Sequence, residues 1–394
     1  MSQHARHRSE DHGFARTGPV HLGVDLTDAG AHPAAWRTLG SQAQRLFDAQ
    51  RLAALVATAQ RGLLDLVAFD DAFSLQPVTR HGVQGRLDAA LVAARLAPRC
   101  AGIGLVPTID TTHTEPFHVS KAVATIDHVS RGRAAWQVGW STTQQATDAF
   151  GRKPVQDEAD AIDEAGDVID VVGRLWDSWE DDAEIRDSAT GRFVDREKLH
   201  HVDYEGIRFA VKGPSITPRP PQGRPPVIVT ATSEAALRLA ARRADVVRLR
   251  ATSLDDALEQ RARLGALAAE AGRAADELRV LADTYVVLGD DEASARARLA
   301  LLDDLEPSSW TTDSLVHVGT AAGFAETIGS WVAAGAVDGF HVRPSSLSTD
   351  LDVLVDRVVP LLQAAGLFRT GYPGRTLRDT LGLTRPANVF AATA

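Results

Sequence analysis

The chain has 394 residues, of which 44% are hydrophobic and 24% charged, and this ordinary balance excludes a mostly disordered or fibrous protein. The formal net charge of −10 argues against a nucleic-acid-binding surface, because phosphate recognition needs a basic face. Cys100 is the only cysteine, which excludes an internal disulfide and a cysteine-rich metal site. We expect no metal site.

The first 17 residues are polar and rich in His and Arg, and no apolar segment follows them. We therefore expect a flexible tail over 1–17 and one domain over 18–394. No apolar run approaches the length of a membrane span, so the sequence predicts a cytoplasmic protein with no membrane association.

Short runs rich in β-branched residues alternate with longer stretches in which apolar residues recur with the period of an α-helix. Each parallel crossover needs a connection of helix size, so this alternation predicts an α/β protein with a single (β/α)8 TIM barrel. A doubly wound sheet is the alternative, but no Gly-x-Gly-x-x-Gly follows the first run, where Gly23 stands alone. The eight candidate strands are 20–25, 65–69, 101–107, 134–139, 227–230, 245–249, 279–288 and 339–342.

Three helix starts are suggested by capping residues. Ser41 and Gln44 form a capping-box pattern before a helical stripe that ends at Gly62. Ser233 and Thr320 stand where the N-caps of two later helices should be.

The segment 177–226 interrupts the alternation of strands and helices, since it is first charged and then rich in turn-forming residues and prolines. It follows the helix after the fourth strand. So long a connection within a compact domain is more typical of a lid or a docking insertion than of a plain linker.

Polar groups and aromatic side chains gather at the carboxyl ends of the strands, where barrel proteins place their sites. There is no Gly-x-Ser-x-Gly, Walker loop or His-Glu-x-x-His, so the chemistry would have to come from a bound organic cofactor. The polar and aromatic side chains at the strand ends suit a flat aromatic ligand with hydrogen-bonding edges. The helix start at Ser233 would offer backbone N–H groups to a phosphate.

Several blocks of this sequence resemble the bacterial luciferase-like flavin monooxygenases, most closely the subgroup of nitrilotriacetate monooxygenase component A. The resemblance runs from about residue 18 to the C-terminus. The most specific blocks are TTHTEPFHV at 111–119 and ATIDHVSRGRAAW at 124–136, and others are LWDSW at 175–179, 218–229, FHVRP at 340–344, 366–372 and LGL at 381–383.

The resemblance implies a monooxygenase that binds FMN at the carboxyl ends of the barrel strands. The FMN would arrive reduced from a separate NAD(P)H:flavin reductase and react with O2 to oxidise a small organic substrate. It also implies a homodimer. Two alternatives stay open: a deazaflavin (F420)-dependent oxidoreductase on the same barrel, and a non-catalytic flavin-binding barrel.

By the same resemblance, His32 matches a position near the substrate and is the candidate catalytic proton donor. Three departures from the family pattern put the flavin site in question: Gln137 replaces an Asn, Trp140 replaces a Thr, and Ile162 stands at an expected Tyr. The phosphate turn over 230–234 also lacks its usual glycine. The residues expected to contact the flavin are Asp70, Asp71, Thr108, Gln137, Ser141, Thr230, Ser233 and Glu234.

Overall fold

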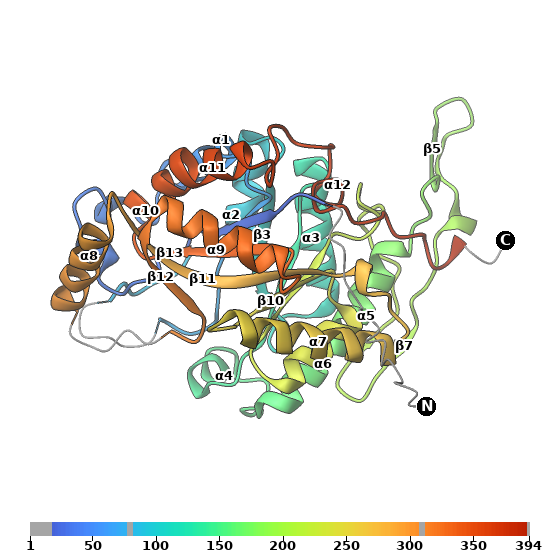
Figure 1. The fold of residues 1–394 in the computed structure, drawn as a ribbon. Coiled ribbons are helices and arrows are strands. Elements are labelled where there is room, and N and C mark those ends of the chain that lie inside the picture. The colour runs from blue at the N-terminus through green and yellow to red at the C-terminus, as the bar shows by residue number, and fades with distance from the viewer. Residues whose placement is uncertain (1–17, 77–81, 307–311, 392–394) are drawn as a thin grey trace, which may run out of the picture.

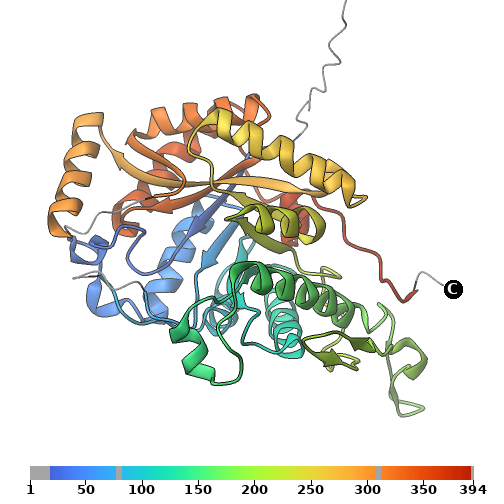
Figure 2. The ribbon, with the colours of Figure 1, turned by 90° about the horizontal axis from the view of Figure 1, so that it is seen from below.

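The computed structural model describes residues 18–76, 82–306 and 312–391. The predicted tail over 1–17 lies outside these residues. Within them, eight parallel strands form a barrel that closes where β10 pairs with β11, and helices surround it (Figures 1 and 2). The (β/α)8 prediction is confirmed. The barrel strands are β1 (His21–Asp25), β2 (Leu66–Phe69), β3 (Gly104–Asp110), β4 (Trp136–Gly139), β9 (Val227–Ala231), β10 (Val246–Leu249), β11 (Arg279–Gly289) and β13 (Gly339–Pro344).

The strands are buried on both faces, as expected when helices cover a parallel sheet. Every residue of β2 and β3 is buried. The covering helices turn one apolar face toward the barrel, and the largest of three buried clusters in the described residues contains side chains of both layers. The helices are α1 (Ala49–Arg61), α2 (Ala89–Leu96), α3 (Pro116–Ser130), α4 (Gln144–Phe150), α5 (Glu158–Asp177), α6 (Glu234–Arg243), α7 (Leu254–Glu270), α8 (Glu292–Leu305), α9 (Ala321–Ala333), α10 (Leu347–Val353), α11 (Val359–Ala364) and α12 (Leu377–Leu381).

One further parallel strand, β12 (Leu315–Thr320), pairs with the outer half of β11 beyond the barrel rim. The sequence did not predict it, because its residues are mostly half-buried or exposed and form no apolar run. Its presence extends β11 past the strands on either side.

The expected capping box at Ser41 is wrong. Helix α1 begins at Ala49, where the Asp48 side chain accepts a hydrogen bond from the backbone N–H of Gln50. The Ser41 hydroxyl instead donates to the carbonyl of Trp36. The N-caps predicted at Ser233 and Thr320 are confirmed, since each side chain accepts a backbone N–H of the first turn of α6 or α9.

The segment after α5 carries two small antiparallel ribbons, β5 (Glu184–Asp187) with β6 (Arg192–Val194) and β7 (Tyr204–Glu205) with β8 (Ala210–Val211). The β5–β6 hairpin projects on the right of Figure 1, beside the C-terminus and at the end of the molecule away from α8. It therefore lies far from the loops at the carboxyl ends of the strands.

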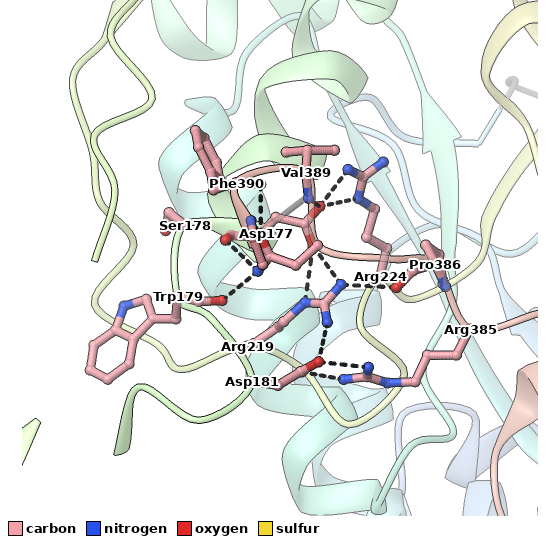
Figure 3. Close-up of polar contacts among 12 residues, drawn as sticks. Asp177, Ser178, Trp179, Asp181, Arg219, Arg224, Arg385, Pro386, Val389 and Phe390 are labelled. Atoms are coloured by element: carbon pink, nitrogen blue, oxygen red, sulfur yellow. Dashed lines mark hydrogen bonds and ion pairs between the residues drawn. The ribbon is translucent and has the colours of Figure 1, made fainter. Parts of the chain in front are cut away.

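Asp177, at the end of α5, fastens this segment to the barrel (Figure 3). Its carboxylate is fully buried and accepts from the Nε of Arg219 at 3.1 Å and the Nε of Arg224 at 2.8 Å. Its carbonyl accepts from the side-chain amide of Asn388, so the C-terminal segment is tied to the same point. Asp177 thus joins three parts of the chain that lie far apart in the sequence.

The substitution Asp177→Asn should destabilise the fold by about 3–5 kcal/mol, because it removes the buried negative charge shared by Arg219 and Arg224 and leaves Arg224 with no acidic partner among the described residues. The control is Asp181→Asn, which removes the half-exposed partner of Arg219 and Arg385 and should cost less than about 1 kcal/mol. Urea unfolding of both variants measures the difference. Equal losses would show that the buried carboxylate has no special role.

Candidate active site at the barrel mouth

A cavity of about 320 Å³ opens at the carboxyl end of the barrel, between the loops that follow β1 and β2 and the end of β13. This volume is at the lower end of the range of small-molecule sites. His32 and Asp70, predicted from the loops after the neighbouring strands β1 and β2, both line it, as do Asp25 and Arg343. The fold therefore gathers two of the candidate residues around one space.

A close backbone approach holds the loop after β1 in place. Gly30 has a φ of 136°, and a Cβ there would lie 2.5 Å from the carbonyl oxygen of Ser345. Only glycine permits this contact. The backbone N–H of Ala31 donates to the carbonyl of Pro344, and that of His32 donates to Ser345. The rigid strand β13 thereby sets the position of His32.

The His32 ring is buried, and both of its nitrogens have partners. Nδ1 accepts from the backbone N–H of Ala34 at 3.1 Å, which leaves the ring proton on Nε2, 3.1 Å from a carboxylate oxygen of Asp303. Burial lowers the pKa of His32 despite the opposing charge of Asp303. The ring can hold a proton at Nε2 while remaining neutral.

Charged side chains fill the barrel interior just below the cavity. Arg248 on β10 makes two parallel hydrogen bonds, of 2.7 and 2.8 Å, to the fully buried carboxylate of Asp283 on β11. Its third nitrogen donates to the Gln137 amide oxygen at 3.3 Å. Beside this pair, Arg343 donates to the Tyr285 hydroxyl at 2.5 Å and lies 3.6 Å from Asp25.

Paired charges keep these carboxylates ionised in the interior. Burial alone would raise the pKa of Asp25, but the positive charge of Arg343 holds it below its ordinary value. Burial would also raise the pKa of Asp283, but the positive charge of Arg248 outweighs burial, and the pKa of Asp283 is lowered as well. The interior therefore contains fixed charges of both signs.

His341, on β13, lies among these charges with no hydrogen-bond partner for either ring nitrogen within the described residues. Burial, together with the positive charge of Arg248, lowers its pKa from the ordinary 6.5 to about 3. A neutral imidazole between two ion pairs adds no net charge to the barrel. Its unsatisfied nitrogens remain able to bond a ligand or water.

The predicted residues on β3, β4 and β9 lie side by side. Thr108 is in register with Gln137 on the neighbouring strand, and the Gln137 amide donates to the Thr230 hydroxyl at 3.3 Å. Ser141 stands apart from them, because its hydroxyl donates to the Asp110 carboxylate at 2.5 Å.

Three other predicted residues point elsewhere. Asp71 accepts from the backbone N–H groups of Ala72 and of Ala89, at the start of α2, so its carboxylate caps that helix. Ser233 caps α6. The Glu234 side chain turns outward to Arg238 and Arg263, so any contact from this position to a ligand would use its backbone N–H.

Two of the residues that depart from the family pattern pack in or against the hydrophobic core. Ile162 is buried in the core on α5, and Trp140 packs against the same core. Ile162 has no polar group to replace the hydroxyl of the expected Tyr. Trp140 offers only its indole N–H in place of the hydroxyl of the expected Thr.

Sequence reasoning missed the interior charges of Arg248, Asp283, His341 and Arg343 as one group. A signal existed, since Arg248 interrupts an apolar strand and Asp283 interrupts the next strand in the sequence. Charged residues inside a buried strand need partners. The pattern could not say which strands would supply them.

Polar groups at the carboxyl ends of the strands suit the hydrogen-bonding edge of a flavin. The cavity adjoins unsatisfied buried atoms on β13 and the following loop, the ring nitrogens of His341 and the hydroxyl of Ser345. The start of α6 offers backbone N–H groups that suit a phosphate. Within the described residues, no group of three or more His, Cys, Asp or Glu side chains could hold a metal ion.

Comparison with known proteins gives the class. Residues 29–337 match the luciferase-like monooxygenase family. The chain is 30% identical to the N-acetyl-S-(2-succino)cysteine monooxygenase of Bacillus subtilis, over 94% of this chain and 98% of that protein. It is also 30% identical to nitrilotriacetate monooxygenase component A of Aminobacter aminovorans, with the same coverage. A solved structure of riboflavin lyase with modified FMN and riboflavin superimposes with a TM-score of 0.86 at 25% identity, covering 94% of this chain and 97% of that one.

The chain therefore belongs to the luciferase-like monooxygenase family, and the resemblance read from its sequence is confirmed. It is a flavin-dependent monooxygenase of the two-component class. None of the helices that the structure describes is long and apolar enough to cross a membrane.

The low pKa of His341 predicts a pH-dependent stability. As the pH falls below 6.5, the unfolded chain takes up a proton at His341 that the folded protein does not. The folded state should therefore lose about 2 kcal/mol from this residue between pH 7 and 5.

The variant His341→Gln should lack this part of the pH dependence in urea unfolding at the two pH values. The control His118→Gln, on the exposed face of α3, should keep the wild-type slope. A His341→Gln slope equal to that of the wild type would contradict the assignment.

Proposed function

We propose that this protein is an FMN-dependent monooxygenase that receives reduced FMN from a separate NAD(P)H:flavin reductase and uses O2 to oxidise a small organic substrate. The observation that carries the proposal is the mouth cavity, where His32 and Arg343 face one space beside Asp70 in a chain of this family. The named relatives of similar length are monooxygenases, which favours FMN over the deazaflavin alternative.

The bound reduced flavin would supply the electrons that activate O2. Thr108, Gln137 and Thr230, on three neighbouring strands, would hold the polar edge of the flavin ring through their hydroxyl and amide groups. The first turn of α6 would hold the phosphate through its backbone N–H groups.

His32 is the proton-holding residue of the proposal. Its proton sits on Nε2 at the cavity wall, and the Nδ1 bond to Ala34 fixes that tautomer. To act on a bound ligand, Nε2 would leave Asp303 and donate a hydrogen bond to a ligand oxygen, and the neutral ring would keep its proton. Asp25 and Arg343 would orient the polar groups of the substrate at the other wall.

We further propose that the protein works as a homodimer in the cytoplasm. The neighbouring helices α2 and α3 expose Leu91 and Val129, at 70% and 47%, on the outer surface. Burying apolar side chains of this kind favours association.

The phosphate position can be tested by charge. Ser233→Asp keeps a good N-cap for α6, because Asp caps as well as Ser, but places a negative charge where the phosphate would lie. FMN affinity should fall at least tenfold, whereas riboflavin, which has no phosphate, should bind within about twofold of wild type. Fluorescence titration of both flavins measures the ratio.

The matched variant is Thr320→Asp at the N-cap of α9, beside the loops where barrels often bind phosphate. It should leave the FMN-to-riboflavin ratio unchanged. If Thr320→Asp weakens FMN and Ser233→Asp does not, the phosphate binds at α9 and the α6 assignment is wrong.

Gln137→Ala should weaken FMN binding about twofold to tenfold, which is the loss of one neutral hydrogen bond. The present contacts of its side chain are long, 3.3–3.4 Å, so a ligand can replace them. Gln137→Asn should recover part of the affinity. Unchanged FMN affinity in a folded Gln137→Ala protein, checked by circular dichroism, would make the residue structural.

A further inference from the structure

A second and larger cavity, of about 700 Å³, lies at the other end of the barrel from the mouth. Its walls come from the second half of α5, the end of α6, the amino ends of β9 and β10, and the C-terminal segment. No residue of this groove belongs to the candidate active site. We call it the arginine groove.

The groove is basic although the protein is acidic overall. Two aspartates, Asp170 and Asp245, are its only acidic lining residues, against a net charge of −10 for the whole chain. The cations that line it are Arg174, Arg224, Arg242, Arg243, Arg273 and Arg378. Such a local reversal of charge concentrates anions at one place.

Part of this positive charge is used within the protein. Arg243 makes two hydrogen bonds to Asp170, of 2.9 and 2.7 Å. Arg378 pairs with Asp245 at 3.0 Å. Arg224 is held by the buried Asp177 (Figure 3). These pairs fix the wall of the groove and cancel the two aspartates that line it.

Arg174 and Arg242 are different, because both are exposed and their guanidinium groups make no hydrogen bond or ion pair with any residue in the described part of the chain. Arg174 comes from α5 and Arg242 from the last turn of α6. Each planar guanidinium can bind a phosphate or carboxylate through two parallel hydrogen bonds. The groove thus carries two uncommitted anion-binding groups from two helices.

An apolar wall accompanies the cations. Val389 and Phe390 of the C-terminal segment line the groove with Trp176 and Ile169 of α5. Phe390 is held in place by stacking on His200, with ring centroids 5.0 Å apart. Figure 3 shows Val389 between Phe390 and Arg224. A wall of this kind suits the flat organic part of a ligand.

We propose that the arginine groove binds a small organic molecule that carries at least two phosphate groups, of which a nucleoside diphosphate is the simplest example. The phosphates would lie between Arg174 and Arg242, and the base would lie against Val389 and Phe390. The volume suits a molecule of that size. A longer nucleic acid is disfavoured, because the surrounding surface of an acidic protein repels a continuous chain of phosphates.

The test is isothermal titration of the full chain with ADP, pyrophosphate and adenosine, in the presence of saturating FMN so that the mouth is occupied. ADP should bind with a Kd below 1 mM, pyrophosphate more weakly, and adenosine not measurably. Raising the KCl concentration should weaken ADP binding, as expected for a charge-driven contact.

The double variant Arg174→Gln/Arg242→Gln should bind ADP at least tenfold more weakly and keep its FMN affinity. The control is Arg95→Gln, in the last turn of α2, which removes an exposed arginine outside the groove and should bind ADP as the wild type does. Absent ADP binding by the wild type, or equal binding by the double variant, would overturn the proposal. Neither result would touch the function proposed for the mouth, because FMN binding is measured separately.

Discussion

The structure depends above all on the closure of the sheet between β10 and β11. Their parallel register places Arg248 opposite Leu281 and Leu249 opposite Ala282. In this register the Arg248 guanidinium donates two hydrogen bonds to the Asp283 carboxylate. An open sheet would leave both charges on edge strands in contact with water. In the closed barrel they must pair, because an isolated buried charge would be far too costly.

The same closure orders the mouth. Once Arg248 is fixed by Asp283, its remaining nitrogen reaches past β9 to Gln137 on β4, and Gln137 reaches Thr230 on β9. On the other side, β13 carries His341 and Arg343 and holds the loop of His32 through backbone hydrogen bonds. The two halves of the candidate site are therefore positioned by strands, whose place is fixed, and the loops add the side chains that face the cavity.

The sequence predicted the barrel strands well, because buried parallel strands are short apolar runs that contrast with amphipathic helices. It missed β12, whose half-exposed residues give no such contrast. It placed a capping box at Ser41, although Asp48 performs that role seven residues later, since a local motif does not reveal which turn the tertiary contacts favour. The Arg248–Asp283 pair was also missed, because its partners are 35 residues apart and only closure brings them together. For the same reason, the arginine groove could not be foreseen: it forms where α5, α6 and the C-terminal segment meet.

The most direct test of the account is a crystal structure of the protein soaked with FMN. We expect the phosphate at the first turn of α6, bonded to backbone N–H groups next to Ser233, with the polar edge of the ring at Gln137 and Thr108. A phosphate bound at the start of α9, beside residues 341–344 or in the arginine groove would contradict the proposed site.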